Sequence, residues 1–322
     1  MRSTEALNKR QNWADIAKAF SIILLVSWHA DGFHWLFSYL RMPLFFLVSG
    51  YFAYNAIHNA DAKKFFRDKV GNMMYLYVVW SLIVTVALYI FADRGRVAYH
   101  LENWLHILWQ PLPTMWFIYA LAVAFVICRL LRSLTFVPVL VVSLLLFLVV
   151  EINISGNVGF IDKVIKLFPF FWIGLKAPKA VGKAVEVGKV LFPVTFAAYF
   201  ALAWYGKNIP DSLFGFYYFI TALIGIVSVA GLSMFISRFS FAAFLSAIGG
   251  ATVYIYLMHR PALYYLEGVL KKLDIEFVGL TALTVLTVVV ACYWVGKWMT
   301  NTKGLRHLLS APWVARKVRV MK

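Results

Sequence analysis

Long apolar runs separated by short polar segments dominate the hydrophobic pattern of the chain. The runs Leu213–Ile236, Phe239–Met258 and Phe277–Gly296 contain no charged residue. Each matches the roughly 20 apolar residues that a helix needs to cross the hydrocarbon core of a bilayer. The same pattern along the whole chain predicts about ten membrane-spanning helices, at residues 13–30, 35–54, 74–92, 114–131, 136–151, 161–175, 190–206, 213–236, 239–259 and 277–296.

The composition agrees with a protein that lies in the lipid bilayer. Hydrophobic residues make up 62% of the 322 residues and charged residues only 14%, whereas about 25% of an average soluble domain is charged. The expected fold class is therefore all-α, a polytopic membrane helical bundle that forms a single domain over residues 1–322. Within it, the segment 161–175 is interrupted by Lys166 and Pro169.

The basic residues predict the orientation of the helices. Of the 31 Lys and Arg residues, 21 fall on the side that holds both termini, seven on the other side and three inside spans. Because Lys and Arg resist translocation, both termini are expected in the cytoplasm, with residues 1–12 and 298–322 as tails. The net charge of +17 has the same explanation. Since no zinc-finger spacing or basic-aromatic groove accompanies it, no nucleic-acid partner and no metal are expected.

The first predicted span contains three ionisable residues, Asp15, Lys18 and His29. A charge at the centre of a membrane helix costs about 2.5–3.5 kcal/mol on insertion scales, so such residues usually line a cavity or meet a partner. Eleven helical residues make about three turns and rise about 16.5 Å, which places Lys18 and His29 on nearly one face. Asp15 can pair with Lys18 one turn later. For these two, snorkelling to the cytoplasmic surface and a functional role both stay open, whereas function is favoured for His29.

Four predicted spans bring polar or aromatic residues to one depth near the outer side of the membrane. They are His29, Arg41, Trp116 and His259, with Arg260 beside the last. Alone, Trp116 fits an aromatic belt and His259 an interfacial histidine. Two histidines and an arginine together indicate a candidate site. A transporter would also place charges there, but the paired broken helices of many transporters are not evident, and a membrane scaffold would not need both histidines.

Five motifs, "DIAK…H", "MPLFFLVSGYF", "WFIYAL", "FPFFWIGL" and "YIYLMHRP", follow one another between residues 10 and 298. In this order they resemble the integral-membrane acyltransferase-3 family, in particular its fucose O-acetylase-like branch of sugar acyltransferases. The resemblance implies an enzyme of the bacterial inner (plasma) membrane that moves an acyl group, acetyl first of all, from cytoplasmic acyl-CoA to a sugar or glycolipid hydroxyl of a cell-surface or exported glycan. A secondary transporter or exporter of a small polar solute stays open as an alternative, as does succinyl transfer to a glucan.

The resemblance also implies roles for individual residues. In the family, a basic residue and a histidine essential for transfer are separated by ten positions, which matches Lys18 and His29. His29 is thus the candidate general base, a role that contributes typically about 10²–10⁴-fold, although an acyl-histidine intermediate stays open. Arg41 is a candidate clamp on substrate or oxyanion. The remaining matches are Ser49, Gly50 and Tyr51 (Ser-Gly-aromatic), Trp116 and Phe117 (Trp-Phe), and Tyr256 and His259 (Tyr-Leu-x-His).

The donor, acetyl-CoA, is expected to bind through cytoplasmic basic residues that attract its phosphates. The candidate residues for the donor are Arg10, Asp15, Lys18, Lys63, Arg67 and Lys69. The sequence departs from the family at one element. Where the family often has Arg-x-x-Arg followed by Leu-Leu-Pro-Tyr, the closest register here gives Lys69 and Asn72, and no proline follows.

Overall fold

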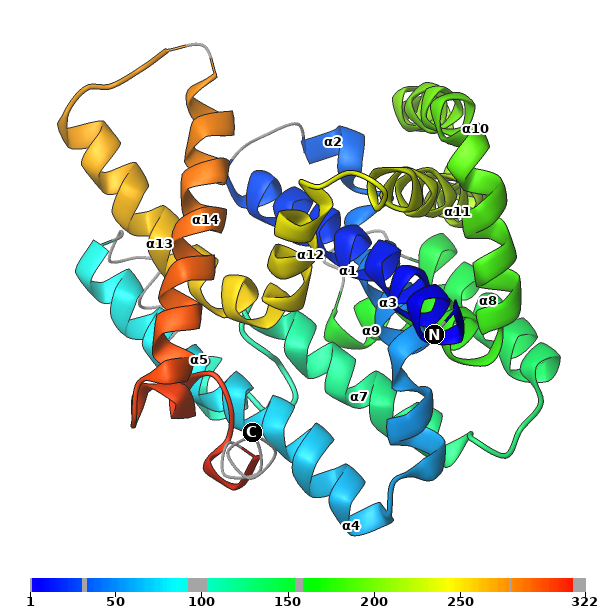
Figure 1. Ribbon diagram of the computed structural model, residues 1–322, viewed down its shortest axis with the longest axis horizontal. Coiled ribbons are helices and arrows are strands. Elements are labelled where there is room, and N and C mark those ends of the chain that lie inside the picture. Colours follow the sequence, from blue (N-terminus) through cyan, green and yellow to red (C-terminus); the bar gives the residue numbers. More distant parts are fainter. Residues whose placement is uncertain (1, 31–33, 92–102, 154–158, 278, 315–322) are drawn as a thin grey trace. The chain divides into compact units, whose positions relative to one another are not determined.

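The computed structural model describes residues 2–30, 34–91, 103–153, 159–277 and 279–314. In this part of the chain all regular elements are helices, as the hydrophobic pattern predicted (Figure 1). The chain divides into two compact units. Unit 1 comprises residues 1–28, 33–55 and 131–252, and unit 2 comprises residues 29–32, 56–130 and 253–322. Because each unit joins separate stretches of chain, neither could be cut out of the sequence as a domain.

Unit 1 contains most of the N-terminal helix and the middle of the chain. Its elements are α1 (Arg2–His29, to residue 28), α2 (His34–Phe37), α3 (Arg41–Tyr54), α8 (Phe136–Asn153), α9 (Phe160–Lys176), α10 (Pro178–Tyr205), η4 (Gly206–Asn208), α11 (Asp211–Ile236) and α12 (Ala242–Gly250). The helices α10 and α11 lie against each other (Figure 1). Their backbones meet at Gly188 and Gly231, where a Cβ atom on either residue would collide with the other helix.

The helices α3 and α9 cross through a second pair of glycines. A Cβ on Gly50 would meet the backbone carbonyl of Phe171, and a Cβ on Gly174 would meet that of Leu47. Small residues allow membrane helices to approach closely and gain van der Waals contact. The Ser-Gly-aromatic motif is therefore part of a helix-packing contact, and Tyr51 beside it packs edge-on against Trp13 of α1, with ring centroids 5.5 Å apart.

The segment that the sequence interrupts with Lys166 and Pro169 is one continuous helix, α9. Lys166 Nζ lies 2.6 Å from Glu151 Oε1 of α8, and the Glu151 side chain is only 4% exposed. Pairing lowers the cost of placing either charge in an apolar surrounding. The pairing explains how α9 keeps a lysine in its middle.

Unit 2 contains His29, the last residue of α1, with Ala30 after it, the helices between residues 56 and 130, and those that follow residue 253. Its elements are η1 (Asn55–Asn59, from residue 56), α4 (Ala62–Phe65), η2 (Phe66–Val70), α5 (Gly71–Phe91), η3 (Asn103–His106), α7 (Trp116–Leu130), α13 (Thr252–Lys272, from residue 253), α14 (Leu280–Asn301) and η5 (Leu305–Leu308). Tyr77 of α5 donates a hydrogen bond of 2.6 Å to the carbonyl of Ile107, and its ring packs on Tyr119 of α7.

Four helices of the described chain are long and apolar enough to cross a membrane, namely Ala62–Ala87, Pro178–Asn208, Asp211–Ile236 and Leu280–Asn301. The bent pair α12 and α13 makes a fifth if it is counted as one span. Trp116–Leu130 and Phe136–Ile152 are apolar but shorter. The prediction of one unbroken span at 239–259 was wrong, because α12 ends at Gly250 and a new helix starts at Thr252.

The two expected tails also have regular structure. The helix α1 begins at Arg2, so the segment 2–12 is helical. After α14, the chain packs onto α5: the Trp80 indole N–H donates to the Leu308 carbonyl over 2.5 Å, and the Ala311 N–H donates to Asn72 Oδ1 over 2.7 Å. The described part of the C-terminal tail therefore lies on its own unit.

Candidate active site

Two histidines that are far apart in the sequence lie side by side in unit 2. His29 ends α1, and His259 lies in the middle of α13, where the sequence had placed it at the end of a span. The two ring centroids are 5.2 Å apart, and the planes are inclined by 36°. His259 is 1% exposed, and His29 is half-buried. The imidazoles therefore form a pair that is largely shielded from solvent.

A backbone hydrogen bond sets the proton position on His259. Its Nδ1 lies 2.6 Å from the carbonyl oxygen of Tyr256 on the preceding turn. Because a carbonyl can only accept, Nδ1 carries the proton and donates it. In the neutral ring, Nε2 then holds the free lone pair. This Nε2 atom is buried and has no hydrogen-bond partner among the described residues.

In His29 the same ring nitrogen, Nδ1, accepts a hydrogen bond, whereas in His259 it donates one. Arg260 Nη1 lies 3.2 Å from His29 Nδ1. A guanidinium only donates hydrogen bonds, so His29 Nδ1 is the acceptor and the neutral ring carries its proton on Nε2. Arg260 also stacks over the ring of Tyr264, with 4.7 Å from Cζ to the ring centroid. The sequence analysis named Arg260 only as a neighbour of His259, although a cation inside an apolar run was the signal for it.

An aromatic group supports the histidine pair from the start of α7. The Tyr256 ring lies 5.9 Å from the His259 ring and 5.3 Å from that of Phe117. Its hydroxyl donates to the carbonyl of Thr114 over 3.3 Å. Trp116 in turn packs edge-on against Phe117. The structure thus places His29 beside His259, and Phe117 of the Trp-Phe pair packs on Tyr256, one turn before His259.

Arg41 belongs to unit 1, where it opens α3. Its guanidinium lies over the Trp28 ring, 3.4 Å from Cζ to the centroid. Ser21 Oγ donates to its backbone carbonyl over 2.7 Å. Its Nε and Nη1 atoms are buried and have no hydrogen-bond partner among the described residues. Its role as a clamp on substrate or oxyanion and its membership of the histidine site both stay predictions.

The candidate donor residues on α1 are engaged with each other. Lys18 Nζ lies 2.9 Å from Asp15 Oδ1 and over the ring of Phe52, 4.1 Å from its centroid. This pairing fits the expected one-turn ion pair and gives Lys18 a structural reason to be in the helix. Arg10 also lies in α1, but its side chain is outside the described part of the structure.

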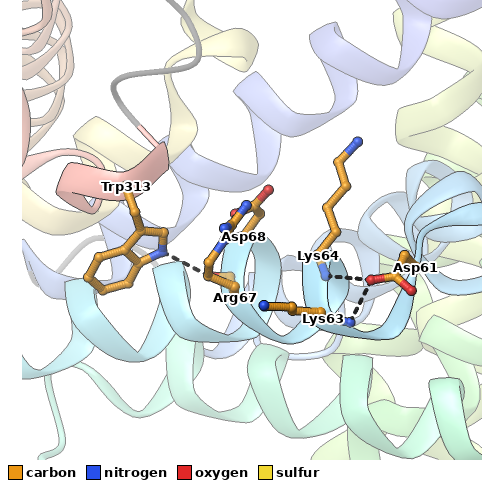
Figure 2. Close-up of polar contacts among 6 residues, drawn as sticks. All are labelled: Asp61, Lys63, Lys64, Arg67, Asp68 and Trp313. Atoms are coloured by element: carbon orange, nitrogen blue, oxygen red, sulfur yellow. Dashed lines mark hydrogen bonds and ion pairs between the residues drawn. The ribbon is translucent and has the colours of Figure 1, made fainter.

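The basic segment after α3 is helical and not a loop, because α4 and the π-helical turn η2 lead directly into α5. Figure 2 shows Asp61 capping this segment: its Oδ2 accepts from the backbone N–H groups of Lys63 and Lys64 over 2.9 and 3.3 Å. Arg67 Nε lies 2.8 Å from Asp68 Oδ1. The side chains of Lys63, Lys64, Arg67 and Lys69 are exposed, so this surface is accessible to an anionic ligand.

The C-terminal tail contacts the same segment. The Trp313 indole N–H donates to the backbone carbonyl of Arg67 over 3.0 Å (Figure 2). Asn72, which stands where the family often has a second arginine, binds the tail backbone at Ala311. The side chain at this position therefore holds the tail in place.

The histidine pair, the Trp-Phe pair and the basic segment are the features expected of a membrane acyltransferase, and comparison with protein families agrees. The model of the acyltransferase-3 family, an acyltransferase domain, matches residues 11–295. This chain belongs to the acyltransferase-3 family. A search of curated proteins and a search of solved structures gave no match. The chain is accordingly a membrane acyltransferase. The family match by itself does not specify the donor, the acceptor or the catalytic residues.

Proposed function

We propose that this acyltransferase-3 member is an O-acyltransferase. It moves an acyl group, for which acetyl is the first candidate, from cytoplasmic acyl-CoA to a sugar hydroxyl of a cell-surface or exported glycan. The observation that carries the proposal is the pair of adjacent imidazoles, in which His259 Nε2 has a lone pair and His29 Nε2 has a proton. Attack of an alcohol on a thioester needs both a proton acceptor and a hydrogen-bond donor at the carbonyl oxygen.

His259 is the general base in this proposal. Its Nε2 takes the proton of the sugar hydroxyl as the oxygen attacks the thioester carbonyl carbon. His29 was the base expected from the sequence, but its Nδ1 accepts from Arg260 and its Nε2 is protonated. The hydrogen bond of His259 to the Tyr256 carbonyl orients its ring and leaves Nε2 available.

His29 is the electrophilic partner. Its Nε2–H donates to the carbonyl oxygen as negative charge develops there in the tetrahedral intermediate. The intermediate collapses with cleavage of the C–S bond, and the CoA thiolate takes the proton from His259 Nε2. The products are the sugar ester and CoA thiol, and both imidazoles return to their starting forms.

The donor enters from the cytoplasmic side in this scheme. The exposed cations Lys63, Arg67 and Lys69 attract the CoA phosphates, and Arg10, Asp15 and Lys18 lie along α1 on the way to His29. The acceptor comes from the outer side, with Arg41 as a clamp on one of the substrates. This requires the orientation predicted from the sequence, with about ten spans and both termini inside a bacterial inner membrane.

Transfer of label from radioactive acetyl-CoA to an oligosaccharide, measured on purified protein in nanodiscs, tests the proposal. His259→Gln should lower kcat by about 10²–10⁴-fold. His29→Gln should lower kcat by about 10²–10³-fold, as loss of an oxyanion donor does. The exposed His106 is the control, because His106→Gln should leave the rate unchanged.

Four further outcomes are informative. Full activity of His259→Gln would rule out His259 as the general base. Label that becomes attached to the protein without acceptor, and that acid releases, would replace direct transfer by an acyl-histidine route. Faster turnover of succinyl-CoA would change the donor. Uptake of an unmodified solute into proteoliposomes, without any acyl transfer, would favour a transporter.

A further inference from the structure

A cavity of about 440 Å³ lies in unit 2 at the connection between α13 and α14. Its volume is within the range of about 300–1,000 Å³ that is usual for small-molecule sites. The lining residues are Ala30, Glu267, Leu270, Lys271, Asp274, Ile275, Glu276, Leu280, Thr281 and Thr284. All of them belong to the unit that contains His29 and His259.

The cavity adjoins the histidine pair through two elements. Ala30, which follows His29 directly, lines it. On α13, Glu267 comes seven residues after Arg260, which corresponds to about two helical turns and about 10.5 Å along the same face. One face of α13 therefore presents Arg260 to His29 and, farther along, Glu267 and Lys271 to the cavity. An acceptor that occupies the cavity has to span this distance to place a hydroxyl at the imidazoles.

The lining groups favour a ligand rich in hydroxyls. Glu267, Asp274 and Glu276 supply carboxylate oxygens that accept hydrogen bonds, and Thr281 and Thr284 supply hydroxyls that donate and accept. Leu270, Ile275 and Leu280 supply apolar surface for the C–H faces of a sugar ring.

The balance of charge narrows the ligand class. Of the described residues that line the cavity, three carry a carboxylate and one, Lys271, is a cation. A ligand with a carboxylate or phosphate near this position meets like charge, which is unfavourable. A neutral sugar or an amino sugar meets no such penalty.

We propose that this cavity binds the acceptor of the acyl group, and that the accepted sugar residue is uncharged or carries an amine. The proposal rests on the acyltransferase function proposed above. It assigns Glu267 and Asp274 as specificity residues that bind sugar hydroxyls, outside the histidine machinery that carries out the chemistry.

The variants Glu267→Gln and Asp274→Asn test the carboxylates with little change of shape. Asp274 has a φ of 52°, a left-handed conformation that asparagine tolerates as well as aspartate does. Folding at this turn is therefore retained in Asp274→Asn. Glu186, an exposed carboxylate of α10 in the other unit, provides the matched control Glu186→Gln.

Two measurements follow. The first is equilibrium binding of three fluorescent oligosaccharides of equal length, neutral, amino and glucuronate-containing, to protein in nanodiscs without donor. The neutral and amino sugars should bind more tightly than the acidic one. Glu267→Gln and Asp274→Asn should each weaken binding by about tenfold, the usual cost of one hydrogen bond to a charged group, whereas Glu186→Gln should not.

The second measurement is acyl transfer to the same sugars. In the two variants, KM for the sugar should rise by about tenfold while kcat and KM for acetyl-CoA stay within twofold. Tighter binding of the acidic sugar, or equal affinities in the wild type and both variants, would contradict the proposal that the cavity binds the acceptor. Absence of acyl transfer to every sugar counts against the proposed function instead, while the binding result still decides whether the cavity holds a sugar.

Discussion

His259 and Arg260 are adjacent in the chain but bind different partners. His259 donates a hydrogen bond to a carbonyl of its own helix, and Arg260 donates one to His29 at the end of α1. The two contacts give the paired imidazoles opposite proton positions. A histidine is both a donor and an acceptor when neutral, so the group bound at one nitrogen decides what the other can do. Arg260 is on this view a positioning residue for His29.

Removing the Arg260 guanidinium tests this role. Arg260→Leu should lower kcat for acyl transfer by about tenfold or more, because His29 loses the donor that fixes its tautomer. KM for acetyl-CoA should stay within twofold, and Arg260→Lys, which keeps a donor, should recover part of the loss. Steady-state kinetics on purified protein give both values.

The exposed Arg238 of unit 1 provides the control, since Arg238→Leu should leave kcat unchanged. A rise in KM for acetyl-CoA at constant kcat in Arg260→Leu would instead make Arg260 a donor-binding residue.

At the scale of elements, glycines decide how closely the helices of unit 1 pack. At the crossing of α3 and α9, Gly50 and Gly174 each face the backbone of the other helix. By contrast, Gly182 on α10 has no atom within 4 Å of the position where a Cβ would stand. The chain therefore contains both a glycine pair that packing requires and a glycine that it does not.

Gly50→Ala and Gly174→Ala should each destabilise the protein by about 1–3 kcal/mol, the usual cost of overpacking. The added Cβ meets backbone, which cannot turn aside as a side chain can. Gly182→Ala should be neutral or stabilising by up to about 1 kcal/mol, because alanine favours a helix. Thermal unfolding in one detergent ranks the three variants, and equal midpoints for Gly50→Ala and Gly182→Ala would contradict the close crossing.

At the scale of the whole molecule, the distribution of Lys and Arg predicts how the protein is oriented in the membrane. In this orientation the basic segment around Lys64 lies in the cytoplasm, and the end of α13 at Lys272 lies outside. Both native cysteines are buried, Cys128 at 0% and Cys292 at 3% exposure, so they contribute little background to thiol labelling.

In intact cells, a membrane-impermeant maleimide should label Lys272→Cys and not Lys64→Cys. After the cells are opened, both should be labelled, because both side chains are exposed. The reverse pattern would invert the predicted topology and put the basic segment out of reach of cytoplasmic acyl-CoA.

The sequence by itself determined the class of protein and the place of several of its helices. Apolar runs such as 213–236 and 277–296 became α11 and α14 within a few residues, because a helix satisfies its own backbone in lipid and needs only local apolar sequence to form. The same local reading found His29 and His259, since an ionisable group in an apolar run is visible without a structure. It also found the motifs that led to the family.

Only the tertiary structure decided which groups meet. The hydrogen bond between His29 and Arg260 joins residues 231 positions apart, and no local pattern encodes its polarity. The anchoring of the tail by Asn72 and the pairing of Lys166 with Glu151 likewise depend on neighbours from other helices or segments. Local hydrophobicity determines where the helices form. The packing of side chains between the helices determines which polar groups come into contact.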